Sequence, residues 1–327
     1  MDTEENKTLA ELITELLRTS EQEINSYITE VISHVNLKDT KAVSHCYFLT
    51  LDGNGRPQTK DFARFIARHV ADYAIPRKEF AEAQKYDREH NTSTKTTQLV
   101  KKAEALFTSL KRTGEGGEML LYILVQEYLK LPQLICKMPL KTNSELHVNG
   151  ADGIHVSVET NQAGQEILSL YWGESKLYKD MSGAISSCFE SLKEFLLSDG
   201  GEGAPAERDL QLLRGNLDVI DERLGTVILK YLDKDDPLHN QVNYKGVCLI
   251  GFDYDKYPST ANSETTEQIK AKIQAEIEAW STSVIGQISK HTNLNTFDIH
   301  VFLLPFPSVE EFRKHFLEAL GLSYEPS

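Results

Sequence analysis

Two acidic residues and a lysine stand at the ends of an expected β-hairpin, where they could act together on a substrate. Asp152 comes just before the first strand-forming run, and Glu174 and Lys176 follow the second run. Residues 161–164 between the two runs are typical of a turn. If the turn centres near residue 163, antiparallel pairing places Asp152 opposite Glu174, with Cβ atoms roughly 5 Å apart.

The charged residues of the hairpin share a face with its apolar residues. Because strand side chains alternate between faces, Lys176 lies on the face of Glu174. The same face carries an apolar stripe, which consists of Ile154, Val156, Val158, Leu168, Leu170 and Trp172. Carboxylates are rarely buried without a cationic partner or a metal ion. The position of Asp152, Glu174 and Lys176 at the end of this stripe therefore indicates a functional site.

A third carboxylate, Glu118, begins a helix expected over residues 118–131. It lies on the helix face that the spacing predicts to be buried, together with Leu121, Tyr122, Val125, Tyr128 and Leu129. A glutamate in the first turn also interacts favourably with the helix dipole and needs no other role. Its place at the head of an apolar face still makes Glu118 a candidate for the same site.

Together these residues favour metal-dependent chemistry on a phosphate. Hard oxygen ligands suit Mg²⁺ or Mn²⁺ and would not select zinc. We expect Asp152 and Glu174 to hold the ion, with Glu118 and the backbone carbonyl of Ser175 as further ligands. Such an ion polarises a phosphodiester and lowers the pKa of a bound water. Lys176 is expected to orient that water or to stabilise the charge that develops on the phosphate.

Each of these residues also has an ordinary structural interpretation. Glu174 and Lys176, two positions apart on a strand, could form a surface ion pair, and Asp152 could belong to a turn.

The glycine-rich segment 113–118 lacks the Gly-Lys-Ser/Thr of a Walker motif and gives no support to an ATPase. The ten histidines show no HExxH motif or paired metal-ligand spacing, and no Ser/His/Asp arrangement can be argued from spacing.

The order of expected elements predicts an α/β fold with a mixed sheet, in which a hairpin comes first and crossover helices later. Residues 1–75 are expected to form a mainly helical accessory region, and residues 76–327 one domain with a helical excursion at about 198–240. Helices are expected at 8–35, 59–73, 79–110 with an interruption at 90–94, 118–131, 181–197, 207–221, 222–232, 264–291 and 310–320. Strands are expected at 45–51, 133–138, in the hairpin, and at 245–253 and 297–304.

Composition limits the classes of function. The chain has 327 residues and a formal net charge of −14, which argues against unaided, high-affinity binding to nucleic acid. Basic residues outnumber acidic ones in segment 77–112, which could be a solvated helix or a patch for a polyanion. The start of the chain lacks the apolar core of a signal peptide, and no apolar run is long enough to span a membrane. The four cysteines show no paired spacing, so we expect reduced thiols in a cytoplasmic protein.

The pattern formed by Glu118, Asp152, Glu174 and Lys176 resembles the PD-(D/E)XK nuclease motif, and the element order resembles the restriction-endonuclease-like core of that superfamily. Ala151 stands where the motif usually has proline. More closely, the segments GGEMLLYILVQEYL, GADGIHV and WGESKLY resemble the DUF1837 family, which includes HamA, the nuclease subunit of the Hachiman antiphage defence system. The resemblance covers roughly residues 40–320.

The resemblance implies a metal-dependent DNase that works with a superfamily 2 helicase (HamB-like) encoded alongside it. We therefore predict a Mg²⁺- or Mn²⁺-dependent deoxyribonuclease of the PD-(D/E)XK type that forms a heteromeric complex with this helicase. Its predicted catalytic residues are Glu118, Asp152, Glu174 and Lys176, and its predicted metal ligands are Asp152, Glu174, Ser175 and Glu118. The alternative is an inactive nuclease-like domain that only scaffolds or inhibits a partner. Lys176 favours the enzyme, because metal binding alone would not require a lysine.

Overall fold

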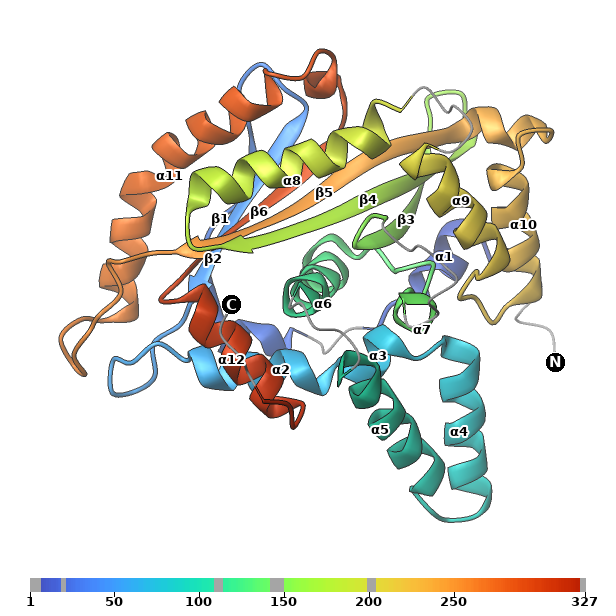
Figure 1. The fold of residues 1–327 in the computed structure, drawn as a ribbon. Helices are drawn as coiled ribbons and strands as arrows, with labels where there is room; N and C mark the ends of the chain where they lie inside the picture. The colour runs from blue at the N-terminus through green and yellow to red at the C-terminus, as the bar shows by residue number, and fades with distance from the viewer. Residues whose placement is uncertain (1–6, 19–21, 109–113, 142–149, 199–203, 324–327) are drawn as a thin grey trace.

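One mixed β-sheet organises the residues that the computed structural model describes, namely 7–18, 22–108, 114–141, 150–198 and 204–323 (Figure 1). The strands are β1 (Ile28–Asn36), β2 (Ala42–Leu49), β3 (Gly153–Thr160), β4 (Glu166–Tyr178), β5 (Val242–Asp253) and β6 (Ile299–Phe306). The longer helices are α2 (Thr59–Arg68), α4 (Arg77–Glu89), α5 (Thr94–Thr108), α6 (Glu115–Leu124), α8 (Met181–Leu196), α9 (Pro205–Gly215), α10 (Glu222–Leu232), α11 (Thr266–Ile288) and α12 (Val309–Ala319). The short ones are α1 (Leu9–Thr14), α3 (Val70–Ala74), α7 (Met138–Lys141), the π-helix η2 (Val125–Leu129) and the 3-10 helices η1 (Glu23–Ser26), η3 (Pro237–Gln241) and η4 (Leu294–Thr296).

The six described strands follow the order β1-β2-β6-β5-β4-β3. The inner strands β2, β6, β5 and β4 are parallel to one another, while β1 and β3 pair antiparallel at the two edges. Strands β5 and β6 are buried on both faces, which explains their nearly continuous apolar sequences. The predicted α/β fold with a mixed sheet, consistent with a restriction-endonuclease-like core, is confirmed.

Strand β4 is covered by a different helix on each face. Trp172 stacks on Phe195 of α8, with ring centroids 5.1 Å apart. A Cβ atom on Gly173 would lie 3.1 Å from Leu121 of α6. Because consecutive strand residues point to opposite faces, α8 and α6 lie on opposite faces of the sheet. Even-numbered residues of β4 therefore face α8, and odd-numbered residues face α6.

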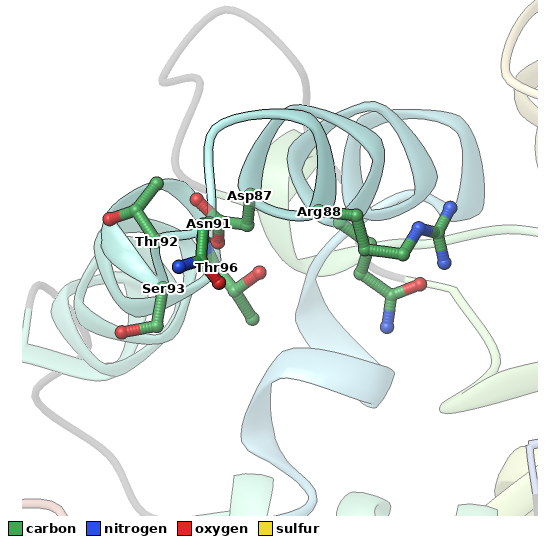
Figure 2. A pocket seen from close by; sticks show the side chains of 7 residues that line it. Asp87, Arg88, Asn91, Thr92, Ser93 and Thr96 are labelled. Carbon is green, nitrogen blue, oxygen red and sulfur yellow. Dashed lines mark hydrogen bonds between the residues drawn. The ribbon is translucent and has the colours of Figure 1, made fainter.

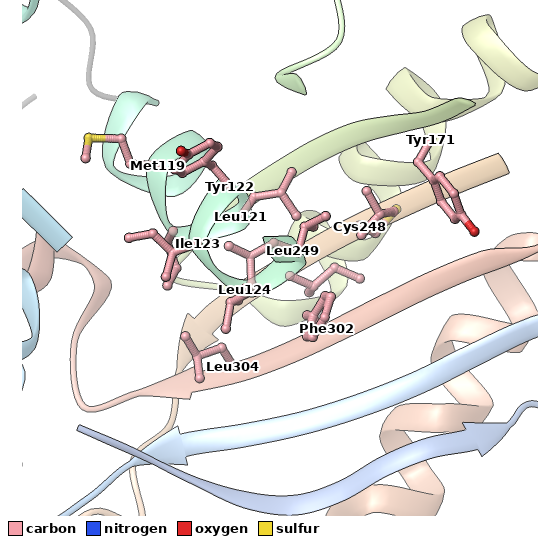
Figure 3. Close-up of a cluster of buried hydrophobic side chains, with 14 of the residues drawn as sticks. Met119, Leu121, Tyr122, Ile123, Leu124, Tyr171, Cys248, Leu249, Phe302 and Leu304 are labelled. Carbon is pink, nitrogen blue, oxygen red and sulfur yellow. The ribbon is translucent and has the colours of Figure 1, made fainter. Parts of the chain in front are cut away.

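Helix α6 is enclosed by other parts of the protein. All of its residues from 116 to 124 are buried, and Figure 3 shows its apolar side chains against Leu249 of β5 and against Phe302 and Leu304 of β6. Helices α2 and α12 pack on each other and cover α6 from the other side (Figure 1). A helix that is apolar all round is stable only in such a position, so the head of α6 is held firmly beside the sheet.

Of the helix predicted over residues 8–35, only the short α1 and the 3-10 helix η1 are helical, and the last part forms β1. The spacing of Ile24, Ile28 and Ile32 suggested a helix, but the β-branched residues of this segment favour a strand. Pairing with β2 makes β1 part of the same sheet as the hairpin. The division at residue 75 stays a prediction, although two strands from before it complete the sheet.

The strand predicted over 133–138 forms only isolated bridges, from Gln133 to His155 and from Ile135 to Leu217. Pro132 has no N–H to donate to a ladder, and α7 begins directly after this segment. The helix expected over 118–131 is α6 followed by the π-helix η2, and the interrupted basic helix is the pair α4 and α5. The helix expected over 59–73 is α2 followed by α3, and the helix expected over 207–221 ends at Gly215. The other expected elements are confirmed, with boundaries that shift by a few residues. No helix in the described ranges combines the length and the apolar sequence needed to cross a bilayer.

Candidate active site at the open end of the hairpin

The hairpin β3–β4 has the register predicted from its turn. Gly153 pairs with Gly173, and the N–H of Asp152 donates to the carbonyl of Gly173 at 2.8 Å. Extending this register by one residue places Asp152, which directly precedes β3, across from Glu174. Strand β4 continues past this point to Tyr178. The two carboxylates come from adjacent strands at the same end of the hairpin.

Glu174 and Lys176 project toward α8 and form an ion pair with each other. Glu174 is 4% exposed, so the pair is not an ordinary surface contact. Burial raises the pKa of Glu174 above its ordinary value, although Lys176 acts in the opposite direction. Burial by itself lowers the pKa of Lys176, but attraction to Glu174 outweighs it and the net pKa is raised. Lys176 is therefore charged at neutral pH.

Ser175, between these two residues, projects toward α6 and is bound by Asp152. Oδ2 of Asp152 accepts the backbone N–H of Ser175 at 2.7 Å and its hydroxyl at 2.6 Å. Since the N–H and C=O of one strand residue point the same way, the carbonyl of Ser175 also points to this edge of β4. That orientation suits the ligand role predicted for this carbonyl, and the role itself stays a prediction.

Glu118 lies in the first turn of α6, is 8% exposed, and accepts a hydrogen bond from the hydroxyl of Tyr73 at 2.8 Å. The neighbouring Gly117 allows α6 to approach β4 closely. A Cβ atom there would lie 2.4 Å from Cδ1 of Leu177 and 3.1 Å from Oγ of Ser175. The glycine-rich segment thus has a packing role, and it brings the head of α6, with Glu118, to the hairpin.

Shared electrostatic neighbours indicate that the candidate residues lie near one another. After burial and the influence of Lys176, the charge of Glu118 also contributes to the raised pKa of Glu174. Asp152, after Glu174, contributes to the raised pKa of Lys176. Burial raises the pKa of Tyr73 well above its usual value, and both Glu118 and Asp152 add to this effect. The structure therefore brings together residues from α6, from β4 and from the position directly before β3.

The donor set fits a hard divalent cation, although the carboxylates do not form a preassembled cage. Within the described ranges, no group of three or more His, Cys, Asp and Glu side chains is arranged to hold a metal ion. Mg²⁺ does not need such a group, because it keeps several waters and is bound through one or two carboxylates plus substrate phosphates. Asp152 and Glu174, opposite each other across the hairpin, meet that smaller requirement.

Sequence reasoning missed three residues that contact the candidate site. Tyr73 lies in the mainly apolar helix α3, where the sequence predicts an ordinary core aromatic residue. Nothing in the sequence therefore indicated its contact with Glu118. Lys137 and Asp209 form a buried ion pair next to Ala151. Here a signal existed, because Lys137 interrupts the apolar run of residues 134–140, where an unpaired lysine is costly.

The basic segment of the sequence forms α4 and α5, which make an arm that extends from the body of the protein (Figure 1); residues 109–113 lie outside the described ranges. Several of its basic side chains are paired within the arm. Lys102 contacts Glu79, and Lys101 contacts Glu104, each at 2.7 Å. The arm therefore carries mixed charges and does not present a uniformly basic surface for a polyanion.

A hollow at the tip of the arm is a poor candidate for catalysis. Its lining consists of Gln84, Asp87, Arg88, Asn91, Thr92, Ser93 and Thr96 (Figure 2). The carboxylate of Asp87 accepts the N–H groups of Lys95 at 2.9 Å and of Thr96 at 2.8 Å. Asp87 thus accepts hydrogen bonds from N–H groups that the first turn of α5 leaves without a partner inside the helix. No second carboxylate lines the hollow.

The fold and the candidate site define a class of protein: an α/β protein with a restriction-endonuclease-like core, in which a hairpin and a helix head bring together acidic residues and a lysine. A family model described as HamA matches residues 25–320, nearly the whole chain. The chain belongs to the HamA family, and it is therefore a protein associated with Hachiman antiphage defence. The searches of curated proteins and of solved structures gave no match.

Proposed function

We propose that this protein is a metal-dependent DNA nuclease, the effector subunit of a Hachiman-type complex with a helicase. The observation that carries the proposal is the register of the hairpin, which puts Asp152 across from Glu174. Lys176 contacts Glu174 on the same strand face. Membership of the HamA family supports the same conclusion.

In this proposal Asp152 and Glu174 would hold Mg²⁺ or Mn²⁺, with the carbonyl of Ser175 and Glu118 as further ligands. When bound, the ion polarises the scissile phosphodiester and lowers the pKa of a bound water. Lys176, kept protonated by its surroundings, donates hydrogen bonds to Glu174 or to a phosphate oxygen. Its positive charge then stabilises the negative charge that develops on the phosphate.

One observation favours the alternative, a catalytically inactive nuclease-like subunit that scaffolds or inhibits a helicase partner. Each candidate carboxylate has a contact that structure alone would explain: Glu174 with Lys176, Asp152 with Ser175, and Glu118 with Tyr73. In a catalytic site, the neutral amide at one of these acids abolishes cleavage in a protein that is still folded, whereas a purely structural site has no cleavage to lose.

A nicking assay separates the two functions. The purified protein is incubated with supercoiled plasmid in Mg²⁺, in Mn²⁺ and in EDTA, beside the Glu174→Gln variant. Nuclease activity, in the chain alone or in the partner complex below, predicts nicked or linear plasmid with either metal and intact plasmid with EDTA or the variant. Parallel reactions with RNA test the substrate class. Intact plasmid with the wild-type protein under every condition, including the partner complex below, would favour the scaffold.

The helicase partner is the second part of the proposal. A formal net charge of −14 opposes binding to a polyanion, and the mixed charges of the α4–α5 arm do little to offset it. A DNA-binding partner would supply the missing affinity. Co-expression with a helicase encoded next to this chain should give a stable complex in size-exclusion chromatography, with DNA degradation that depends on ATP turnover. Strong cleavage by the isolated chain at physiological salt, unaffected by the helicase, would contradict this partnership.

A further inference from the structure

A buried ion pair joins two segments that are far apart in the sequence. Nζ of Lys137, just before α7, lies 2.7 Å from Oδ2 of Asp209 on α9, and the side chains are 1% and 3% exposed. Removing two charges from water carries a desolvation penalty, so a buried ion pair is by itself weak evidence for a stabilising role. The other contacts of the pair indicate what it does.

Both members of the pair hold the backbone of Ala151. Nζ of Lys137 donates to the carbonyl of Ala151 at 2.7 Å, and the N–H of Ala151 donates to Oδ2 of Asp209 at 3.0 Å. The residue before it, Gly150, is in close contact with Asp209. A Cβ atom at Gly150 would lie 2.1 Å from Oδ1 of that carboxylate. The chain therefore reaches β3 through a tight clamp made by two charged side chains.

The clamp acts directly next to Asp152. Ala151 is fixed by the ion pair, and the N–H of Asp152 is fixed by the carbonyl of Gly173 on β4. Two consecutive peptide units are thus anchored on different elements. The direction in which the Asp152 side chain leaves the backbone is then determined, and its carboxylate meets Ser175 at the edge of β4. Candidate catalytic groups need this support, because small displacements cause large losses of rate.

We propose that Lys137 and Asp209 are positioning residues that hold Asp152 in place for metal binding. The proposal rests on the proposed nuclease function. It gives the helical excursion a role in the site, because Asp209 comes from α9, which lies within residues 198–240. Lys137 and Asp209 act through Ala151 and contribute no predicted ligand of their own.

The test replaces the pair by apolar residues of similar size, in the double variant Lys137→Met/Asp209→Leu. Such a replacement removes both hydrogen bonds to Ala151 without leaving a buried charge unpaired, and buried ion pairs often tolerate it. The matched control is Arg77→Met/Asp218→Leu. Arg77 and Asp218 form another buried ion pair, with side chains 8% and 7% exposed, and the Arg77 side chain donates its hydrogen bonds to Asp218 and to the carbonyl of Leu16.

Two readouts are compared in wild type and both double variants. The first is amide hydrogen exchange of a peptide that contains Ala151 and Asp152, which reports the clamp whether or not the protein cleaves DNA. The second is the Mg²⁺ concentration that gives half of the metal-induced rise in melting temperature. We expect faster exchange and a midpoint raised about 10–100-fold in the Lys137/Asp209 variant, as for residues that support metal ligands. The control should match wild type in both.

The outcomes separate this proposal from the proposed function. Exchange at residues 151–152 that stays as slow as in wild type would overturn the clamp, even if the protein is an active nuclease. Faster exchange with an unchanged Mg²⁺ midpoint would overturn its positioning role. If the wild-type protein shows neither a Mg²⁺ response nor cleavage, the nuclease proposal fails, and positioning for metal fails with it. If the apolar variant does not fold, Lys137→Arg/Asp209→Glu is used, which retains the charges with altered reach; the same two readouts then decide.

Discussion

The carboxylate of Asp152 and the backbone of Ser175 are joined across the end of the hairpin, with Oδ2 accepting the N–H at 2.7 Å and the side-chain hydroxyl at 2.6 Å. Strand β3 begins only at Gly153, so a side chain supplies the acceptor that the strand ladder does not provide for Ser175. The same contact brings a negative charge to the edge of β4 between Glu174 and Lys176. The carboxylate of Asp152 thus has two roles: it accepts a structural hydrogen bond, and it is a candidate metal ligand.

The Asp152→Asn variant separates these two roles. The amide oxygen can accept the same two hydrogen bonds from Ser175, so the variant should fold. The loss of charge should abolish or strongly weaken the rise in melting temperature on addition of Mg²⁺, which follows mass action in the wild type. Thermal melts over a range of Mg²⁺ concentrations measure this. Ser175→Ala keeps the charge of Asp152 and the hydrogen bond that the carboxylate accepts from the backbone N–H of residue 175. This variant should therefore retain the rise in melting temperature. Equal shifts in wild type and Asp152→Asn would mean that the ion binds elsewhere.

The Glu174–Lys176 pair should be essential for cleavage. We expect Glu174→Ala, Glu174→Gln, Lys176→Ala and Lys176→Met each to reduce the rate by about 10²–10³-fold or more, as does loss of one group that stabilises transition-state charge. Plasmid cleavage rates measure the effect, and circular dichroism checks the fold. Lys193→Ala is the control, because Lys193 forms a partly exposed pair with Glu190 on α8 and such pairs contribute little. Wild-type rates in the Glu174 and Lys176 variants would refute the assignment.

The sequence predicted the hairpin well, because both its turn and its alternation are local signals. Asn161 and Gly164 mark the turn, and the pairing of Gly153 with Gly173 follows from its position. The buried strands β5 and β6 also carry a local signal in their apolar runs. Strand β1 carries no such local signal, because its isoleucines fit a helical spacing and the strand forms only through pairing with β2. Local patterns cannot report such a partner.

In the candidate site, too, local sequence patterns predicted some features, whereas contacts between distant segments could not be predicted. Alternation along β4 is a local rule, and it placed Glu174 and Lys176 on one face, where they form an ion pair. Contacts made by segments distant in sequence could not be inferred, such as Tyr73 with Glu118 and Asp209 with Ala151. These depend on how α3, α6 and α9 pack around the sheet, and one sequence read alone contains no measure of that packing.

Removing the hydroxyl of Tyr73 should test whether Glu118 takes part in catalysis. Tyr73→Phe keeps the buried ring and deletes the hydrogen bond to Oε2 of Glu118. If Glu118 is a ligand or an essential acid, cleavage should fall by about tenfold or more, within the range for a residue that orients a ligand. Tyr122→Phe is a matched control, since Tyr122 packs on Tyr73 and donates to the carbonyl of Asp72 instead. Equal rates in the two variants would argue that Glu118 is structural.

Two buried histidines and one partly buried histidine should make the protein sensitive to mild acid. Burial is the main reason why the pKa of His45 is lowered to about 3 and the pKa values of His155 and His300 to about 4. In the unfolded chain a histidine titrates near 6.5. As pH falls below about 6.5, the unfolded state therefore takes up protons that the folded state does not. The free energy of unfolding decreases until about pH 4, by about 3 kcal/mol for His155 alone.

His155→Asn tests this contribution with little change in hydrogen bonding. Nδ1 of His155 donates to the carbonyl of Leu131 at 3.0 Å, a bond that an asparagine amide can make. Because asparagine does not titrate, the variant should lose less stability between pH 6.5 and pH 4 than wild type, whatever its stability at pH 8. Urea unfolding at several pH values gives the free energies. His90→Asn, at an exposed residue between α4 and α5, is the control for the substitution itself. If His155→Asn has the wild-type slope, acid sensitivity arises from groups other than this histidine.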